Sequence, residues 1–560
     1  MRSAIVRKRQ LGIFLFFLVS LSLLLIRLIY LQVLKHNFYV KIANEQHAVS
    51  VELEPKRGAI FDRSMRVLAI NINCDSIFAN ARLIKDKDDA AKKLAPILGI
   101  DEGAILEKLS KDKAFVWIKR RVTPEISSAV KALKITGIDF VKESKRVYPN
   151  KNLACHIIGT ANIDNVGLEG LELVYNKYLK GESGWLVSTR DAKRKTLESY
   201  QFEYIPPKNG FDLVLTIDEV IQNIAERELA KSCQKFNAKA GCIVVMDPLN
   251  GDILALANYP AFDLNDPSHR VQESIRNRAV NDFYEPGSVF KVVTASALLE
   301  EKAITPNDVI YCENGKWNIG SRYLNDVHPY GNLKFSEVIE KSSNIGTVKS
   351  ASRLGPEKMY KYMKLFGIYE TTGIDLPGEV TGINRPVEKW SKVSMYAIPM
   401  GQEVTVTAMQ LARIISVIAD NGCITKPRIV KEIVDDKGET IKAFPPKILR
   451  RVISPMTAWK VRQILKGVVE RGTGKKARIE DCIAGGKTGT GQKVVNGTYS
   501  HDKFIGSFIG FAPADHPKLA IAVSIDEPHP VYYGGDVAAP VFKVVADEAI
   551  KYMSAKRMKR

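Results

Sequence analysis

The stretch Tyr284-Glu-Pro-Gly-Ser288-Val-Phe-Lys291-Val-Val-Thr-Ala-Ser-Ala-Leu-Leu299 places a serine directly after a turn, at the start of an apolar helix. The Pro-Gly pair interrupts regular structure, and residues 289–299 are apolar on nearly all sides, as in a buried helix. Ser288 and Lys291 are three residues apart, so their side chains share one face. Burial disfavours an ammonium ion and is expected to lower the pKa of Lys291. The stretch therefore predicts a serine nucleophile beside a neutral lysine base.

Two further motifs follow in the chain. Ser342-Ser-Asn344 ends a segment with helical apolar spacing, residues 335–341. Lys487-Thr488-Gly489-Thr490 comes after two glycines and is predicted to be a strand, where glycines let another backbone or a ligand approach closely. The three motifs in this order supply a nucleophile, a base, a second hydroxyl, an amide and a cation, which together indicate acyl transfer through a serine ester.

Each motif alone has a simpler explanation. A serine that caps a helix, followed by a lysine that snorkels to solvent, gives the same pattern as Ser288 and Lys291. Ser and Asn commonly cap helices, so capping explains Ser342 and Asn344 as well as catalysis does. A Gly-rich edge strand with a solvated lysine explains Lys487. The combination favours catalysis, and the same motif set is typical of penicillin-binding proteins and class A β-lactamases.

The N-terminus combines a basic tail with a long apolar run. Residues 1–10 contain four basic side chains, and residues 11–34 are apolar apart from Arg27. That length is sufficient to cross a bilayer. The basic flank predicts a cytoplasmic N-terminus and an extracytoplasmic remainder. A cleaved signal peptide is the alternative, but the run is too long and lacks a clear small-residue cleavage site. Arg27 is expected to snorkel to the outer interface or to face a partner helix.

The rest of the chain is predicted to form two domains. Residues 205–210 are rich in structure breakers, so a pedestal is expected at 35–207 and a second domain at 208–555. In the second domain, strands precede and follow a helical middle at 288–420, and a last helix is expected at 541–553. This order indicates an α+β fold with helices packed on an antiparallel sheet.

Composition excludes several classes of function. The formal net charge of +20 is strongly basic, yet the chain has no zinc-ligand spacing, no compact basic helix and no interleaving of aromatic and basic residues. We therefore expect no nucleic-acid partner, and the spread positive charge suits an anionic envelope surface. The seven cysteines lack Cys-x-x-Cys spacing, so neither a metal site nor disulfides are expected.

Segments along nearly the whole chain resemble the class B penicillin-binding proteins, and more narrowly the division-specific FtsI type. The segments that carry the resemblance are Arg57-Gly-Ala-Ile-Phe-Asp62-Arg63, Gly167-Leu-Glu169-Gly170-Leu-Glu172, Val245-Met-Asp247-Pro248-Leu-Asn-Gly251-Asp-Ile-Leu-Ala255, Gly510-Phe-Ala-Pro513-Ala-Asp515, Ile525-Asp526-Glu527-Pro528 and Tyr533-Gly-Gly-Asp-Val-Ala-Ala-Pro540-Val-Phe542. In one place the chain departs from the family pattern, because Ser64-Met65 follows Arg63 where the family turns through a glycine.

The resemblance implies a peptidoglycan D,D-transpeptidase fold and activity, without a cofactor. Ser288 would attack the stem peptide and Lys291 would take its proton, with the N–H groups of Ser288 and Thr490 holding the oxyanion. Ser342, helped by Lys487, would relay a proton to the departing D-alanine. Asn344 would position the substrate amide. Thr488 and Thr490, on either side of Gly489, would bind the terminal carboxylate of the substrate or of a β-lactam.

The implied partners are stem peptides on lipid II-derived glycan strands, β-lactams, a membrane glycosyltransferase of the FtsW type and other divisome proteins. The implied location is the inner (plasma) membrane, with a single membrane span. Three alternatives stay open. They are an elongation-type transpeptidase, a serine β-lactamase or β-lactam sensor, and a non-catalytic scaffold acting through the pedestal.

Overall fold

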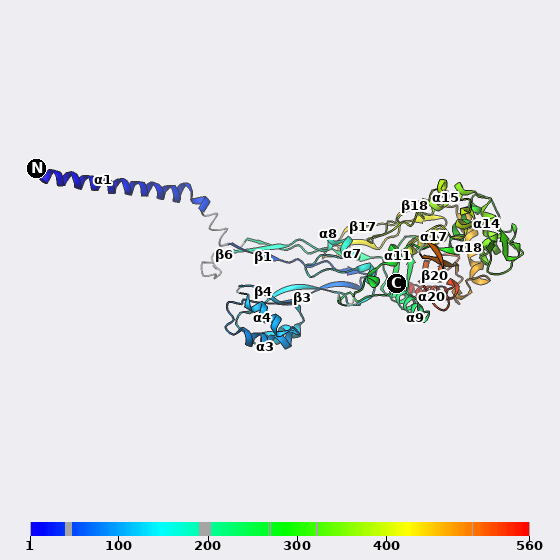
Figure 1. Ribbon diagram of the computed structural model, residues 1–560, viewed down its shortest axis with the longest axis horizontal. Helices are drawn as coiled ribbons and strands as arrows, with labels where there is room; N and C mark the ends of the chain where they lie inside the picture. Colours follow the sequence, from blue (N-terminus) through cyan, green and yellow to red (C-terminus); the bar gives the residue numbers. More distant parts are fainter. Residues whose placement is uncertain are drawn as a thin grey trace. The chain divides into compact units, whose positions relative to one another are not determined.

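The computed structural model describes residues 2–39, 48–111, 113–189, 203–266, 268, 270–320, 323–495 and 497–558. They form two compact units, Met1–Pro55 with Gly181–Asn209, and Lys56–Lys180 with Gly210–Arg560 (Figure 1). The predicted tail and pedestal include positions 1, 40–47, 112 and 190–202, which lie outside the described residues. The larger unit joins residues from both predicted domains, and the domain division near residue 207 stays a prediction.

The smaller unit contains an apolar helix and a three-stranded sheet. Helix α1, Arg2–Ile29, continues into a short π-helix, Tyr30–Leu34. Among the described residues, Ile5–Leu34 is the one helical segment long and apolar enough to cross a membrane, with a mean hydropathy of 2.6. The sheet has the antiparallel order β1 (Ala48–Leu53), β6 (Gly184–Thr189) and β7 (Glu203–Ile205).

The larger unit begins with a mixed sheet. Its strands run in the order β17 (Thr440–Ala443), β16 (Val430–Val434), β8 (Asp212–Leu215), β2 (Ile60–Phe61), β3 (Val67–Ala79) and β4 (Val116–Val122), and β5 (Ile138–Val147) also pairs with β3. Strand β8 pairs with β2 in parallel and with β16 antiparallel. The strand predicted at 211–218 therefore joins pedestal strands to the rest of the unit.

Three short helices cover one end of this sheet and bury their own small core. They are α3 (Lys87–Leu98), α4 (Glu102–Ser110) and α5 (Pro124–Ala132). Asp86, Asp101 and Thr123 cap them, because each side chain accepts a hydrogen bond from a backbone N–H of the first turn. Their apolar faces pack with Ile77 of β3 and Ile118 of β4.

A second sheet of the larger unit has five antiparallel strands. The order is β10 (Ile253–Tyr259), β9 (Ala240–Met246), β21 (Leu519–Asp526), β20 (Thr498–Ala512) and β19 (Gly485–Val495). Along β9, Ile243 and Val245 belong to one core, while Cys242 and Val244 belong to another. This alternation is that of a sheet buried on both faces.

Helices cover both faces of the five-stranded sheet. On one face lie α9 (Glu219–Lys235) and the C-terminal α20 (Ala539–Met558), which contact each other (Figure 1). The other face meets a helical layer that includes α12 (Lys291–Glu300), α13 (Phe335–Glu340), α14 (Asn344–Ala351), α15 (Pro356–Leu365), α17 (Ala408–Ala419) and α18 (Pro455–Glu470). The predicted α+β fold and the covering C-terminal helix are confirmed.

Short elements complete the larger unit. They are the paired strands β11 (Val309–Tyr311) with β14 (Asn332–Lys334), β12 (Lys316–Asn318) with β13 (Tyr323–Asn325), and β15 (Cys423–Thr425) with β18 (Ile448–Arg451), and the helices α6 (Cys155–Ile158), α7 (Gly170–Val174), α8 (Asn176–Leu179), α10 (Gln272–Ile275), α11 (Arg278–Asn281), α16 (Ser394–Ala397) and α19 (Gly534–Val537).

A buried ion cluster joins two of the segments quoted from the sequence. Arg57 Nε donates to Glu172 Oε2 at 2.5 Å, and Arg146 Nε donates to Glu172 Oε1 at 2.7 Å. Arg57 also donates to Asn176 Oδ1 and to the carbonyl of Glu172, both at 2.8 Å. Since Arg57 follows β1, Arg146 lies on β5 and Glu172 lies on α7, the cluster ties three distant parts of the chain together.

The turn after Asp62 keeps its form without a glycine. Asp62 Oδ1 accepts hydrogen bonds from the N–H groups of Ser64, at 2.7 Å, and Arg66, at 2.8 Å. Met65 has a φ of 62° and so occupies the left-handed conformation that glycine adopts most easily. The departure from the family pattern is therefore accommodated by backbone strain at an exposed methionine.

Candidate active site

Ser288 lies in a 3₁₀ turn, Gly287–Phe290, and helix α12 begins at Lys291. The sequence predicted a helix that opens at Ser288, and the structure winds its first turn more tightly. Such turns are frequent at the start of α-helices, and residues i and i+3 eclipse in them, so Ser288 and Lys291 still share a side. Ser288 is half-buried, and its hydroxyl has no hydrogen-bond partner among the described residues.

Glycines bring the nucleophile turn and strand β19 together. A Cβ on Gly287, whose φ is 55°, would lie 2.7 Å from the carbonyl oxygen of Thr490. A Cβ on Gly489 would lie 2.7 Å from the carbonyl oxygen of Pro286. The close approach predicted at these glycines is thus between two backbones, and it places Ser288 beside Thr490.

The side-chain nitrogen of Lys291 is held by the second motif. Lys291 Nζ donates to the carbonyl of Ser342 at 2.7 Å and to Asn344 Oδ1 at 2.8 Å, and Ser342 Oγ lies 3.3 Å away. The side chain is fully buried, which lowers the pKa of Lys291 to about 7, while the negative charge of Asp326 acts in the opposite direction. A neutral amine has two N–H donors and one lone pair. The carbonyl of Ser342 and Asn344 Oδ1, the two nearer acceptors, are sufficient to take both of those donors.

Ser342 Oγ bridges the two buried lysines. Lys487 Nζ, on β19, donates to Ser342 Oγ at 2.9 Å and to the carbonyl of Thr488 at 3.1 Å. Burial lowers the pKa of Lys487 well below its usual value, and repulsion by Lys291 adds to the effect. Ser342 itself has a φ of 61°, a strained conformation for a non-glycine residue that turns its hydroxyl between the lysines.

An acidic residue outside the three motifs fixes the second motif. Asp326 Oδ2 accepts a hydrogen bond from Ser343 Oγ at 2.5 Å, and Asp326 Oδ1 accepts from the N–H of Asn344 and, at 3.0 Å, from that of Ile345. Ser343 Oγ in turn accepts from the N–H of Gly346 at 2.9 Å and caps α14. The capping explanation therefore applies to Ser343, while its neighbours Ser342 and Asn344 face the lysines.

Two hydroxyls of the third motif lie along β19. Thr488 Oγ1 is 2.7 Å from Thr473 Oγ1, and Thr490 Oγ1 accepts from the N–H of Gly534 at 3.3 Å. Tyr532 and Tyr533 directly precede Gly534. Tyr532 stacks on Phe504 with ring centroids 4.1 Å apart, and the two tyrosine rings are 4.6 Å apart. An aromatic wall therefore adjoins the threonine end of the motif.

The structure brings all eight predicted site residues into one region, because the second motif contacts both lysines and the third contacts the nucleophile turn. Sequence reasoning missed Asp326, Thr473 and the aromatic wall. Thr473 lies between two glycines, which is a weak signal, whereas no spacing pattern marks Asp326. No group of His, Cys, Asp or Glu in the described part of the chain is arranged to hold a metal ion.

Family models match two parts of the chain. Residues 241–547 match the penicillin-binding protein transpeptidase domain, and residues 52–215 match the penicillin-binding protein dimerisation domain. The chain belongs to the class B penicillin-binding proteins. Its enzyme class is peptidoglycan D,D-transpeptidase.

Curated penicillin-binding relatives match over nearly their full length. Stage V sporulation protein D of Bacillus subtilis is 36% identical over 99% of this chain and 87% of its own. Probable peptidoglycan D,D-transpeptidase PenA of Neisseria gonorrhoeae is 36% identical over 94% of this chain and 90% of its own. Peptidoglycan D,D-transpeptidase FtsI of Escherichia coli K12 is 31% identical over 96% of this chain and 90% of its own.

Solved structures of similar proteins share the fold of this penicillin-binding protein. A peptidoglycan synthetase from Bifidobacterium adolescentis has a TM-score of 0.73 at 26% identity, covering 90% of this chain and 97% of that one. Penicillin-binding protein 3 from Mycobacterium tuberculosis, complexed with aztreonam, has a TM-score of 0.70 at 28% identity, with the same coverage.

Proposed function

We propose that this transpeptidase cross-links stem peptides through a covalent ester on Ser288. The observation that carries the proposal is the contact of Ser342 Oγ with both Lys291 Nζ, at 3.3 Å, and Lys487 Nζ, at 2.9 Å. A half-buried hydroxyl between two amines of lowered pKa is a path for protons. The path begins beside the nucleophile and ends on the strand that would hold the substrate.

Acylation begins with proton transfer from Ser288. Its oxygen attacks the carbonyl between the two terminal D-alanines, and its proton passes to the lone pair of Lys291 Nζ. The N–H groups of Ser288 and Thr490 hold the oxyanion, which is supported by the close approach of Gly287 to Thr490. Backbone donors that the fold already holds in place need little reorganisation as charge develops.

Collapse of the intermediate breaks the peptide bond. The proton on Lys291 passes through Ser342 to the nitrogen of the departing D-alanine, and Lys487 orients the Ser342 hydroxyl. Asn344 positions the substrate amide, while Thr488 and Thr490 bind the carboxylate of the substrate or of a β-lactam. The amine of a neighbouring stem peptide then attacks the ester, which restores the Ser288 hydroxyl and forms the cross-link.

We propose septal synthesis as the cellular role, at the inner membrane and with the N-terminus in the cytoplasm. The basic residues within 2–9, which flank the apolar run at 11–34, the FtsI relative and the segments at 525–528 and 533–542 support this proposal. The substrate strands must first be polymerised, so the proposed partners are a glycosyltransferase of the FtsW type and other divisome proteins. An apolar helix associates in lipid through packing and polar contacts, and Arg27 offers such a contact.

Intact-mass spectrometry after β-lactam treatment tests the nucleophile. The wild type is expected to carry one adduct, and Ser288→Ala none. Ser296→Ala is the matched control, since Ser296 lies on α12, which follows the nucleophile turn, and among the described residues its hydroxyl bonds only to the carbonyl of Val292, at 2.7 Å. An adduct that persists in folded Ser288→Ala would refute the assignment.

Two further measurements separate the alternatives. A long-lived penicillin ester supports the transpeptidase, whereas nitrocefin turnover near ~10 s⁻¹, the scale of an ordinary enzyme, supports a β-lactamase. Depletion in the native cell separates the two synthetic roles. Long, undivided cells support septal synthesis, and rounded cells that still divide support the elongation-type enzyme.

A further inference from the structure

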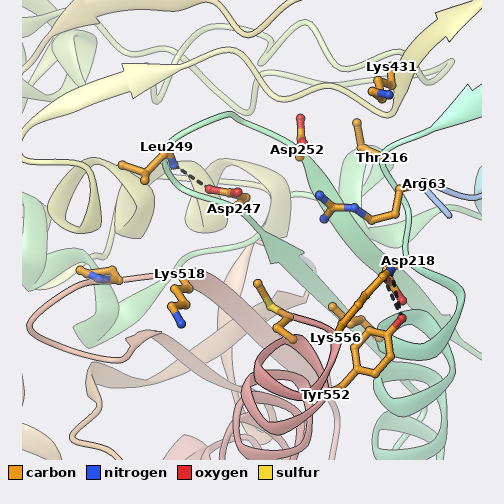
Figure 2. A pocket seen from close by; sticks show the side chains of 13 residues that line it. Arg63, Thr216, Asp218, Asp247, Leu249, Asp252, Lys431, Lys518, Tyr552 and Lys556 are labelled. Atoms are coloured by element: carbon orange, nitrogen blue, oxygen red, sulfur yellow. Dashed lines mark hydrogen bonds and ion pairs between the residues drawn. The ribbon is translucent and has the colours of Figure 1, made fainter. Parts of the chain in front are cut away.

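A pocket of about 510 Å³ lies in the larger unit and is not lined by the candidate active-site residues (Figure 2). Its wall is built from the turn after β2, the β9–β10 and β20–β21 turns, and helix α20. None of the eight candidate residues, all of which the structure describes, lines it. The volume is in the range of small-molecule sites.

The acidic side chains of this pocket differ in how they are paired. Asp252 is bound by Arg428 Nε at 2.5 Å, and Asp218 has Lys556 Nζ 3.4 Å away. Asp247 accepts hydrogen bonds from the N–H of Leu249, at 3.0 Å, and from Asn250 Nδ2, at 3.1 Å. No described cation pairs with Asp247. One carboxylate of the pocket is therefore without a counter-ion.

Two cations of the pocket are also without partners. Among the described residues, neither the Arg63 guanidinium nor the Lys518 ammonium group makes a hydrogen bond or an ion pair, and Lys518 is half-buried. Figure 2 shows the Arg63 side chain extending into the pocket. Arg63 is exposed, so its free guanidinium is open to a ligand, whereas the half-buried Lys518 forgoes a favourable interaction that a charged ligand could supply.

The backbone at Arg63 is fixed by hydrogen bonds. Its N–H donates to the carbonyl of Ile217 at 2.9 Å. The preceding Asp62 is fully buried and accepts hydrogen bonds from the N–H groups of Ser64, Arg66 and Glu219. Because the backbone is already ordered, only the rotamers of the Arg63 side chain must be fixed when it binds an anion.

The lining matches a zwitterion better than a polyanion. Two free cations attract a carboxylate, and the unpaired Asp247 attracts an amine. A phosphate-rich ligand would meet the charges of Asp247, Asp218 and Asp252 in the same hollow. Ile221, Leu249, Pro517 and Met553 add an apolar surface for aliphatic parts of a ligand.

We propose that this pocket binds a peptidoglycan stem peptide that is not reacting, with a carboxylate on Arg63 and Lys518 and an amine on Asp247. The proposal rests on the proposed function for the identity of the ligand. Such a site would hold a peptide-bearing strand on the enzyme while Ser288 acts on another peptide.

The test uses the full chain in detergent, with Ser288 first acylated by penicillin so that the candidate active site is closed. The probes are two tripeptides without D-alanine, L-Ala-γ-D-Glu-L-Lys and its meso-diaminopimelate counterpart, and their dissociation constants are measured by calorimetry. Binding of at least one tripeptide is expected. Arg63→Ala, Lys518→Ala and Asp247→Asn should each weaken it about tenfold, the weight of one charge-assisted contact.

The matched control is Lys437→Ala, an exposed lysine in the β16–β17 turn, which should leave the affinity unchanged. Acetylating the side-chain amine of the probe should weaken its binding to the wild type about tenfold and its binding to Asp247→Asn no further. Lys518→Gln replaces Lys518→Ala if the alanine variant does not fold.

Three results would overturn the proposal. They are no binding of either tripeptide at millimolar concentration, equal affinity in all pocket variants, and displacement of the tripeptide by an equal concentration of inorganic phosphate. Failure of penicillin to acylate Ser288 would instead count against the proposed function, so the two failures are distinguishable.

Discussion

In the segment that matches the dimerisation domain, residues 52–215 and called the pedestal below, Arg57 and Arg146 share the buried carboxylate of Glu172. In the candidate active site, Lys291 and Lys487 share the hydroxyl of Ser342. Both regions take two cationic side chains out of water, which is costly for an unpaired charge. The pedestal offsets the cost with a counter-ion. The candidate active site offers neutral oxygens at hydrogen-bond distance from Lys291 Nζ, and the pKa of that lysine falls to about 7.

The difference separates a structural use of buried cations from a chemical one. An arginine stays protonated at any working pH, so a paired guanidinium is a fixed part of the framework. A lysine can give up its proton when it is buried without a counter-ion. A buried arginine paired with a carboxylate is therefore suited to a structural role. A buried lysine without a carboxylate is suited to proton transfer.

The largest expected effect comes from replacing Lys291 with a residue that stays protonated. Lys291→Arg keeps a cation but removes the lone pair, so acylation by penicillin should fall by about 10²–10⁴-fold, the usual loss with a general base. The measurement is the second-order rate of adduct formation. Near-normal acylation in a folded Lys291→Arg protein would show that no neutral amine is needed there.

Removing the pedestal counter-ion should affect stability instead. Glu172→Gln leaves two buried guanidinium groups without their carboxylate and should cost about 3–5 kcal/mol of unfolding free energy. Hydrogen exchange at the backbone amides of β5 and α7 in the full chain measures the loss locally. Lys437→Ala serves again as the control. Unchanged protection would mean that the ion cluster adds nothing to the stability of the pedestal.

The pH dependence of acylation is the next largest effect. Only the neutral form of Lys291 accepts the serine proton, so the rate should fall about tenfold per pH unit below a pKa of about 7 and level off above it. The profile is measured with the wild type between pH 5 and 9. A rate that is flat across pH 7 contradicts the assignment of this lysine as the base.

Asp326→Asn probes the positioning of the second motif. The Asp326 charge raises the pKa of Lys291, so its loss should move the acid limb of the profile to lower pH. The maximal rate should also fall about tenfold, because Ser343 and the N–H of Ile345 lose a charged acceptor. A lower rate without a shift of the limb would assign Asp326 a structural part only.

Local patterns predicted the α+β fold, the apolar N-terminal helix and the three motifs. Ser288 and Lys291 are neighbours on one turn, so their spacing alone places them on the same side of it. Contacts between segments could not be derived in this way. Asp326 reaches Asn344 through a turn that no periodicity describes, and the left-handed φ of Ser342 depends on what surrounds it. The 3₁₀ turn at Ser288 likewise reflects the packing of Gly287 against β19.

The smallest expected effect concerns strain, which also differs between the two regions. Ser342 and Met65 have nearly the same φ, 61° and 62°. At Ser342 the strain turns a hydroxyl toward two lysines, whereas the Met65 side chain is 55% exposed. A left-handed conformation costs a non-glycine residue roughly 1–2 kcal/mol, and the greater freedom of glycine in the unfolded chain returns part of that. Met65→Gly should therefore stabilise the protein by up to about 1 kcal/mol without changing acylation.

Denaturant unfolding of the full chain measures the effect of Met65→Gly, with Met65→Ala as the matched control. Alanine removes the same side chain but keeps the Cβ that causes the strain, so it should give no comparable gain. Equal stabilisation by both variants would mean that the exposed methionine side chain, and not the backbone at this turn, is unfavourable. The turn at Met65 would then carry no measurable backbone strain, and its comparison with the strained turn at Ser342 would fail.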